Sequence, residues 1–386
     1  MSPRVVEQAE PRQRLVDELT ELGYLTSEWR PSFRDVPREL FIPDTVWVRD
    51  RARFVPLRRR DEPRAWSELV NGDNFVITQV DDGDPRGAGG HGLATSSSSS
   101  MPSVMALMLR RLGAEPGHRV LEIGTGTGYN AALLAHRLGA ANVVTVEVDA
   151  QVATRARATL DAAGFAGVEA ITAAGELGHA PRAPYDRIVS TACVREVPHA
   201  WVRQTRAGGR ILTPWSDGYI DGGLLSLTVG EDGTATGRIV DPCSFMWLRG
   251  QRPPASELIR DGDHATTGTT TLHPHQVAAD FDAQLTIGRR VPRCRKIYEP
   301  YDEARGAGIL WLLDPWSGSW ASHRHTRPDA RDDAFTVHQH GPRSLWNEVE
   351  AAHGWWLATG RPAAADWHFA VGPRGSSVTL DGEAPR

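Results

Sequence analysis

The sequence contains few cysteines, and their arrangement excludes two classes of small stabilised domain. Among 386 residues there are only 3 Cys, at positions 193, 243 and 294. An odd number of widely separated cysteines fits neither a disulfide framework nor a thiolate zinc motif. We therefore expect a protein of a reducing compartment, and place it in the cytoplasm.

The chain also lacks a dominant charge and a long apolar run. Lys and Arg total 43 against 48 Asp and Glu, a net charge of −5. With no broad positive field, we expect no nucleic-acid or anionic-membrane partner. No apolar stretch approaches the ~18 residues of a membrane span, and the charged N-terminal region lacks the apolar centre of a signal peptide. A length of 386 residues fits two domains.

The middle of the chain alternates between β-rich and helical segments. Helices are predicted over Ala131–Leu138 and Gln151–Ala163, between short runs of strand character. Strand, helix and strand at this spacing predict βαβ units and a doubly wound α/β sheet, with an antiparallel pair at its end. The predicted strands are Arg119–Ile123, Val143–Val148, Val168–Thr172, Arg187–Thr191, Arg210–Thr213, Leu224–Thr228 and Arg238–Asp241.

Two helices and a segment of unusual composition precede this region. Apolar spacing predicts a helix over Gln13–Leu22, and another that begins at Pro102 and stops at Gly113. Residues 71–100 are rich in Gly, Asp and Ser and end in a run of serines. Such a segment reads as a linker or as a functional loop.

The C-terminal 136 residues hold seven of the 13 tryptophans, which argues against disorder. We expect a catalytic domain over 1–250, a junction near 250–266, and an accessory α+β substrate-recognition domain over 251–386. Most of these tryptophans should be core, with a minority lining a peptide groove. Three His-x-His pairs could share a strand face, but no further ligands complete a site, so no metal is expected. The pairs are His273/His275, His323/His325 and His338/His340.

The strongest motif is a buried strand that runs into a Gly-rich turn and a helix, at residues 120–129. A dinucleotide fingerprint would need glycine where Tyr129 stands. The E-x-G-x-G-x-G pattern is instead the S-adenosylmethionine (SAM) form, and Glu147, ~20 residues on, can accept hydrogen bonds from ribose hydroxyls. A tight turn with an incidental surface Glu147 is the alternative. The predicted cofactor-binding residues here are Glu122, Gly124, Thr125, Gly126, Thr127, Gly128 and Glu147.

With these motifs in place, residues ~13–249 resemble the protein-L-isoaspartate O-methyltransferases. The resemblance rests on Val36-Pro37-Arg38-Glu39, the serine run before Pro102, the Gly-rich loop, Ala183-Pro184-Tyr185-Asp186 and Gly208-Gly209-Arg210. It implies methyl transfer from SAM to a peptide carboxylate, with S-adenosylhomocysteine as product. The family's T-I-S-x-P segment, which touches cofactor and acceptor, falls on Ser98, Ser99, Ser100 and Met101. Its adenine-binding G-D-G falls on Ala173-Ala174-Gly175, so Ala174 and Gly175 are expected near the adenine, with Glu176 or backbone replacing the missing Asp.

The serine run and the Trp-rich tail further resemble an actinobacterial branch that matures ribosomal peptides in graspetide, lanthipeptide and lasso pathways. This implies methylation of one Asp in a cyclised precursor peptide, whose ester then closes to aspartimide. Two alternatives remain: general repair of isoaspartate in damaged proteins, and a SAM-sensing protein without turnover. Oligomeric state is not predicted.

The chemistry needs no general base, because a carboxylate with a pKa of ~3.9 is already ionised at neutral pH. Serine hydroxyls can orient it without adding charge, so Ser98, Ser99 and Ser100 are the candidate catalytic residues. The alternative is that this serine run is only a flexible linker, whose last residues start the helix at Pro102. Asp186 is interpreted as a residue that stabilises a turn at the start of a strand, and Arg58-Arg59-Arg60 as part of a solvated loop.

Overall fold

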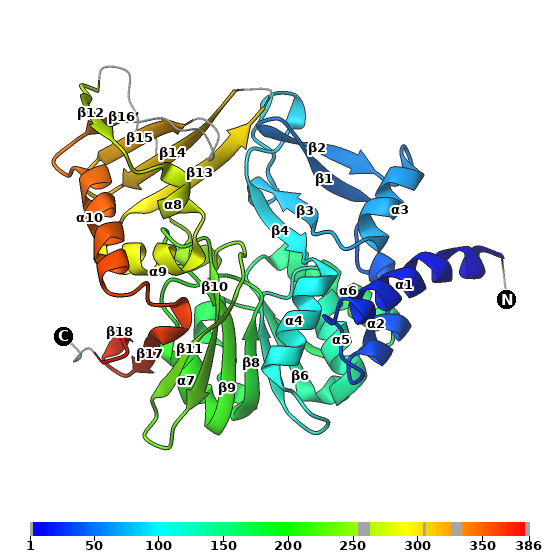
Figure 1. The fold of residues 1–386 in the computed structure, drawn as a ribbon. Coiled ribbons are helices and arrows are strands. Elements are labelled where there is room, and N and C mark those ends of the chain that lie inside the picture. The colour runs from blue at the N-terminus through cyan, green and yellow to red at the C-terminus, as the bar shows by residue number, and fades with distance from the viewer. Residues whose placement is uncertain (1–2, 254–262, 304–305, 326–333, 383–386) are drawn as a thin grey trace.

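The computed structural model describes residues 3–253, 263–303, 306–325 and 334–382 (Figure 1). Part of the predicted junction, residues 254–262, lies outside the described residues. Within the described ranges no helix is long and apolar enough to cross a membrane. The three cysteines are buried free thiols.

A nine-stranded sheet in the order β18-β17-β11-β10-β9-β8-β5-β6-β7 forms the centre of the molecule. Strands β9, β8, β5, β6 and β7 run parallel, and β10 and β11 continue antiparallel. This confirms the predicted doubly wound α/β fold. The strand order reverses between β5 and β8, which is where such sheets bind ligands. The strands are β5 Val120–Ile123, β6 Val143–Glu147, β7 Glu169–Thr172, β8 Tyr185–Ser190, β9 Thr205–Trp215, β10 Gly223–Val229 and β11 Ala235–Pro242.

Most helices begin and end close to their sequence signals, whereas α1 begins at Pro3, ten residues before the predicted start at Gln13. Helix α4 ends at Gly113, which has a φ of +59°, a conformation that glycine adopts without strain. Asp149 caps α6 by accepting hydrogen bonds from two backbone N–H groups. The helices are α1 Pro3–Glu21, α2 Arg30–Asp35, α3 Pro63–Asn71, α4 Pro102–Leu112, α5 Tyr129–Leu138, α6 Ala150–Ala162, α7 His199–Gln204, α8 Pro274–Ala278, α9 Phe281–Arg290 and α10 Leu345–Ala358.

A second sheet, of four strands in the order β2-β1-β3-β4, lies in the N-terminal region. Its strands are β1 Thr45–Asp50, β2 Arg53–Arg58, β3 Val76–Val80 and β4 Thr95–Ser99. The interpretation of residues 71–100 as a linker or functional loop is therefore wrong for Val76–Val80 and Thr95–Ser99, whereas residues 81–94 form the connection between these two strands. Val76 and Val80 are buried, and the serines pair their backbone with β3, for example Ser99 opposite Val76. Backbone pairing to a buried neighbour overrides the low strand propensity of serine.

The C-terminal region builds a five-stranded antiparallel sheet in the order β12-β16-β15-β14-β13. Its strands are β12 Thr266–Thr270, β13 Arg295–Asp302, β14 Ala307–Asp314, β15 Ser319–His325 and β16 Phe335–His340. The chain then returns to the central sheet through β17 Trp367–Gly372, which pairs with β11, and β18 Gly375–Leu380. The domain boundary at residue 250 stays a prediction, and the last hairpin belongs to the first sheet.

Four of the seven C-terminal tryptophans are buried: Trp320, Trp346, Trp356 and Trp367. Trp316, in the turn between β14 and β15, is different because it is 52% exposed. Figure 1 shows the β12–β16 sheet and the β1–β4 sheet above the same end of the central sheet, on opposite sides.

Candidate cofactor and acceptor site

The Gly-rich loop between β5 and α5 has a conformation that needs glycine. Gly124 has a φ of +94°, and a Cβ atom there would lie 2.7 Å from Thr191 Oγ1. Gly128 has a φ of +87°, and its Cβ would lie 3.3 Å from Leu160 Cγ. The loop therefore turns tightly and brings its backbone close to the cavity above it.

Glu147 ends β6 and faces the same cavity. Its Oε2 accepts a hydrogen bond from Gly126 N at 2.9 Å, and its Oε1 accepts one from Asp149 N at 3.1 Å. Each carboxylate oxygen has a further lone pair, so the group can accept two hydroxyls while the backbone holds it in place. This is the arrangement expected of a ribose-binding carboxylate.

Glu122, predicted to bind cofactor, lies beneath the loop and does not line the cavity. It is fully buried and accepts hydrogen bonds from Asn130 Nδ2 at 2.7 Å and Thr145 Oγ1 at 2.6 Å. Burial raises the pKa of Glu122 to about 7, against the lowering effect of these two bonds. Glu122 supports the loop from below.

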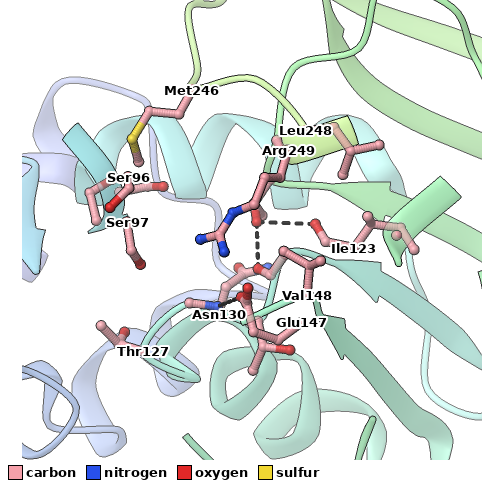
Figure 2. Close-up of a pocket in the computed structure, with 18 of the residues that line it drawn as sticks. Ser96, Ser97, Ile123, Thr127, Asn130, Glu147, Val148, Met246, Leu248 and Arg249 are labelled. Atoms are coloured by element: carbon pink, nitrogen blue, oxygen red, sulfur yellow. Dashed lines mark hydrogen bonds between the residues drawn. The ribbon is translucent and has the colours of Figure 1, made fainter. Parts of the chain in front are cut away.

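The cavity lies between the serine strand β4, the Gly-rich loop with Glu147, and residues 246–252. Figure 2 shows its lining, with the Arg249 side chain pointing inward. Of the predicted residues, the structure brings together Ser98, Ser99, Ser100, Gly124, Thr125, Gly126, Thr127, Glu147 and Gly175, whereas Glu122, Gly128 and Ala174 do not line it. Sequence reasoning missed Ser96, Ser97, Met105, Ile123, Tyr129, Asn130, Val146, Val148, Thr191, Ala192, Met246, Trp247, Leu248, Arg249 and Arg252.

The serine strand β4 is fixed in place by one buried arginine, Arg38. Its side chain is 3% exposed and donates to the Ser99 hydroxyl at 3.3 Å. It also donates to the carbonyl oxygens of Ser99 at 3.2 Å and Ser100 at 2.9 Å. Further carbonyls that it bonds are those of Val70, Gly72 and Asn74. The predicted motif around Arg38 thus acts by positioning the serines.

The five serine hydroxyls of this segment are not equivalent. Those of Ser96, Ser97 and Ser99 are hydrogen-bonded to Gln79, Thr78 and Arg38. Within the described residues, no hydrogen bond engages the hydroxyl of Ser98 or of Ser100, and both residues line the cavity. These two hydroxyls are available to a ligand, whereas Ser99 is structural.

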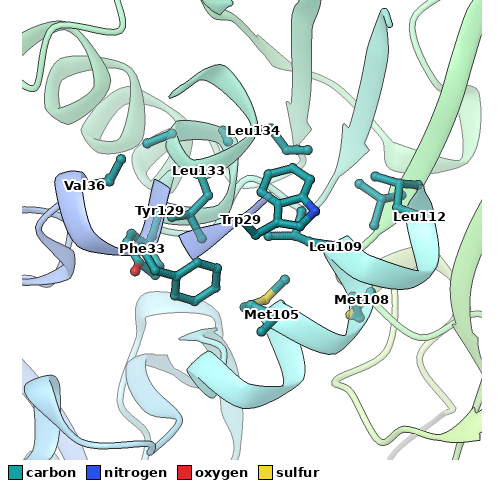
Figure 3. Packing of buried hydrophobic residues seen from close by; sticks show 14 of the residues in the cluster. Trp29, Phe33, Val36, Met105, Met108, Leu109, Leu112, Tyr129, Leu133 and Leu134 are labelled. Atoms are coloured by element: carbon teal, nitrogen blue, oxygen red, sulfur yellow. The ribbon is translucent and has the colours of Figure 1, made fainter. Parts of the chain in front are cut away.

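One hydrophobic core supports both sides of the cavity (Figure 3). Met105 on α4 follows the serine strand, and Tyr129 opens α5 after the Gly-rich loop. The Tyr129 ring packs against Phe33 at 6.4 Å and Phe41 at 5.7 Å between centroids. Because the two elements share this core, the serine strand and the loop are held in a fixed relation.

Residues 246–252, which follow β11 and which we call the strap, cover the cavity. Arg252 donates to both oxygens of Asp82 at 2.8 and 3.0 Å, and so holds the pKa of Asp82 below its usual value. Arg249 lies 3.4 Å from both Asp82 and Asp149. Gln79 also donates to Asp149, at 3.0 Å. The strap thereby joins the N-terminal sheet to the start of α6.

The far end of the cavity is apolar. A Cβ on Gly175 would lie 2.7 Å from Ile123 Cγ2 and 2.9 Å from Leu248 Cδ1, so only glycine leaves this space open. Val148 faces the cavity from the end of β6. Ala174 is exposed outside the lining, and Glu176 is directed toward Gly250. The slot suits a flat heteroaromatic ring such as adenine, held by shape rather than by a carboxylate.

Other residues considered from sequence lie away from this cavity. Asp186 accepts hydrogen bonds from Arg119 N and from the Arg206 side chain at the start of β8. These contacts agree with a structural role for Asp186 at the start of a strand. His323 lies buried in β15, and burial lowers its pKa to about 4. In the described ranges no group of three His, Cys, Asp or Glu could hold a metal. The arginines at 58–60 pair with neighbouring aspartates.

Comparisons with known proteins agree with this geometry. Residues 89–251 match the family profile described as Protein-L-isoaspartate(D-aspartate) O-methyltransferase (PCMT). The protein-L-isoaspartate O-methyltransferase of Hyperthermus butylicus is 32% identical over 252 residues, which cover 63% of this chain and 90% of that protein. That of Methanopyrus kandleri is 32% identical over 243 residues, 62% and 92% of the two chains. The chain belongs to this family.

This protein is a SAM-dependent carboxyl O-methyltransferase. A solved protein-L-isoaspartate O-methyltransferase structure aligns with a TM-score of 0.54 and 21% identity, covering 96% of this chain and 99% of that one. The shared fold therefore extends through the C-terminal sheet. A C-terminal region of this fold therefore also occurs in that solved structure.

Proposed function

We propose that this enzyme methylates the free carboxylate of isoaspartyl residues in peptides and proteins, as a repair activity. The observation that carries the proposal is the pair of unengaged hydroxyls, Ser98 and Ser100, above a loop and carboxylate suited to SAM. The relatives named above are all isoaspartate methyltransferases. They favour this substrate over a cyclised precursor peptide.

The cavity fits SAM, which when bound supplies an electrophilic methyl group on a sulfonium. Glu147 and the Gly-rich loop hold the ribose and the amino-acid part, and the slot beside Gly175 takes the ring. Ser98 and Ser100 donate hydrogen bonds to the acceptor carboxylate and aim one oxygen at the methyl carbon. The strap covers one side of the cavity, and contacts beneath it are strengthened because fewer water molecules compete for them. No residue has to remove a proton, and among the described residues no histidine lines the cavity.

The test replaces Ser98 and Ser100 together with alanine. We expect kcat/KM for an isoaspartyl peptide to fall about 30-fold, from two lost hydrogen bonds to a charged group, while the Kd for SAM stays within twofold. Ser97→Ala is the matched control, because its hydroxyl is engaged by Thr78 in the same strand. Unchanged activity in the double variant would remove these serines from the reaction.

Maturation of a cyclised precursor remains the second candidate, favoured by the length of the serine run, Ser96 to Ser100. The two functions separate when a linear isoaspartyl peptide and a cyclised Asp-containing peptide are assayed side by side by mass spectrometry. Repair predicts that only the isoaspartyl peptide gains a methyl group. Methylation of the cyclised peptide alone, followed by loss of methanol, would establish maturation instead.

A further inference from the structure

Two arginines and two tryptophans meet beside the cavity, from four different parts of the chain. Arg195 follows β8, and its guanidinium carbon lies 5.8 Å from the Trp247 ring and 5.7 Å from the Trp316 ring. Arg293, between α9 and β13, lies 5.7 Å from the same Trp316 ring. We call these four residues the cationic patch.

The patch presents its charge without a neutralising carboxylate. Among the described residues, neither Arg195 nor Arg293 forms an ion pair, and the Arg195 Nε atom is buried without a hydrogen-bond partner. Arg293 is exposed, and Trp316 is the most exposed tryptophan at 52%. Two guanidinium groups thus gather beside two indole rings, on a chain whose net charge is −5.

The patch is continuous with the methyl-transfer cavity. Trp247 lines the cavity and also contacts Arg195. Thr191 and Ala192, at the start of the segment that leads to Arg195, line it as well. A peptide whose acceptor carboxylate reaches Ser98 and Ser100 beneath the strap can extend over Trp247 onto the patch.

We propose that the cationic patch binds carboxylate side chains that flank the acceptor residue, so that the enzyme selects acidic peptide segments. A guanidinium already stacked on an indole face keeps its N–H groups in plane for a carboxylate, and gains strength from the stack. Because the rest of the surface is net negative, an acidic segment is attracted at this place and repelled elsewhere. This inference rests on the proposed peptide-carboxylate substrate.

The test uses two isoaspartyl peptides that differ only in their flanks, one with four Glu and one with four Gln. With the native enzyme we expect KM for the Glu peptide to be about 10-fold lower, from two charge-assisted contacts. In the double variant Arg195→Gln with Arg293→Asn, the KM ratio of the two peptides should fall to about one. Asn is chosen at 293 because Arg293 has a φ of +65°, which Asn tolerates. Raising the salt should reduce the native ratio.

Arg290→Gln is the matched control, because Arg290 stacks on Trp355 at 4.0 Å, away from the cavity lining. It should leave the KM ratio at its native value. A native ratio near one, or a ratio unchanged in the double variant with the fold intact by circular dichroism, would overturn the proposal and assign the arginines to contact between the sheets. If neither peptide is methylated, the proposed function itself fails. If the double variant unfolds, the single Arg293→Asn variant decides, because this exposed residue should account for about a threefold change in the ratio.

Discussion

The two sides of the cavity are built in different ways. The cofactor side comes from one βαβ unit, in which Glu147 lies 21 residues from Gly126 and bonds its backbone directly. The acceptor side is a strand of another sheet, and Arg38 holds it from 61 residues away. The first is local in sequence, and the second depends on long-range contacts.

The difference also concerns how much each side depends on a single residue. The cofactor loop has several supports: glycine conformations, Glu147 from above, and Glu122 with Asn130 and Thr145 from below. The acceptor strand has backbone pairing to β3 on one side and the single guanidinium of Arg38 on the other. Burial lowers the pKa of Arg38 to about 10, so it stays charged at neutral pH. We therefore expect a single substitution on the acceptor side to reduce activity more than one on the cofactor side.

The largest effect is expected from Arg38→Ala. This change leaves five carbonyl oxygens and the Ser99 hydroxyl without their shared donor, so the serines should move by about an ångström or more. A displacement of that size costs about 100-fold in rate. We expect kcat/KM to fall by that factor while the Kd for SAM, measured by calorimetry, changes less than about threefold.

Arg38→Lys sharpens the result, because an ammonium group keeps the charge but can reach fewer of these carbonyls. It should lose activity by an intermediate factor. Arg49→Ala, at an exposed position in β1, is the control for loss of an arginine in the same N-terminal region, because β1 belongs to the sheet that contains β4. Equal loss of SAM affinity and turnover in Arg38→Ala would show that the two sides are not separately supported.

The converse variant is Glu147→Gln, on the cofactor side. An amide keeps the size of the side chain but weakens the acceptor of two ribose hydroxyls and of Gly126 N. We expect the Kd for SAM to rise about 10-fold, with the KM for peptide unchanged at saturating SAM. Glu231→Gln, in an exposed turn, is the control. A change in peptide KM alone would place Glu147 on the acceptor side instead.

Much of the cofactor side could be predicted from sequence, because its signals are local. The strand, the glycines and the acidic residue lie within 30 residues, and their spacing is set by the geometry of a βαβ unit. The same reasoning misplaced Glu122. A buried carboxylate and a ligand-binding one look alike in the sequence, since only the direction in which a strand residue points distinguishes them.

The acceptor side and the strap could not be derived in this way. The serine run reads as a flexible segment until β3 is placed beside it, and the motif at Arg38 gives no hint that its side chain reaches Ser99 and Ser100. The strap follows an antiparallel hairpin, and its role depends on Asp82, 170 residues from Arg252. Contacts of this kind follow from the fold and carry no periodicity or spacing of their own.

The smallest expected effect is on the stability of the folded protein. It tests whether Glu122 supports the Gly-rich loop or contacts SAM directly. Burial raises the folded-state pKa of Glu122 to about 7, above its value near 4.5 in the unfolded chain. The folded protein therefore holds this proton more tightly, so stability falls as pH rises from about 4.5 to 7, by at most about 3 kcal/mol. Glu122→Gln removes that loss, and its new amide can donate to Asn130 Oδ1, which lacks a partner, if the Asn130 amide turns over. We expect the variant to gain in Tm relative to the native protein at pH 8 and not at pH 4.5, with the Kd for SAM changed less than threefold. A large loss of SAM affinity with no pH-dependent gain in Tm would show instead that Glu122 contacts SAM.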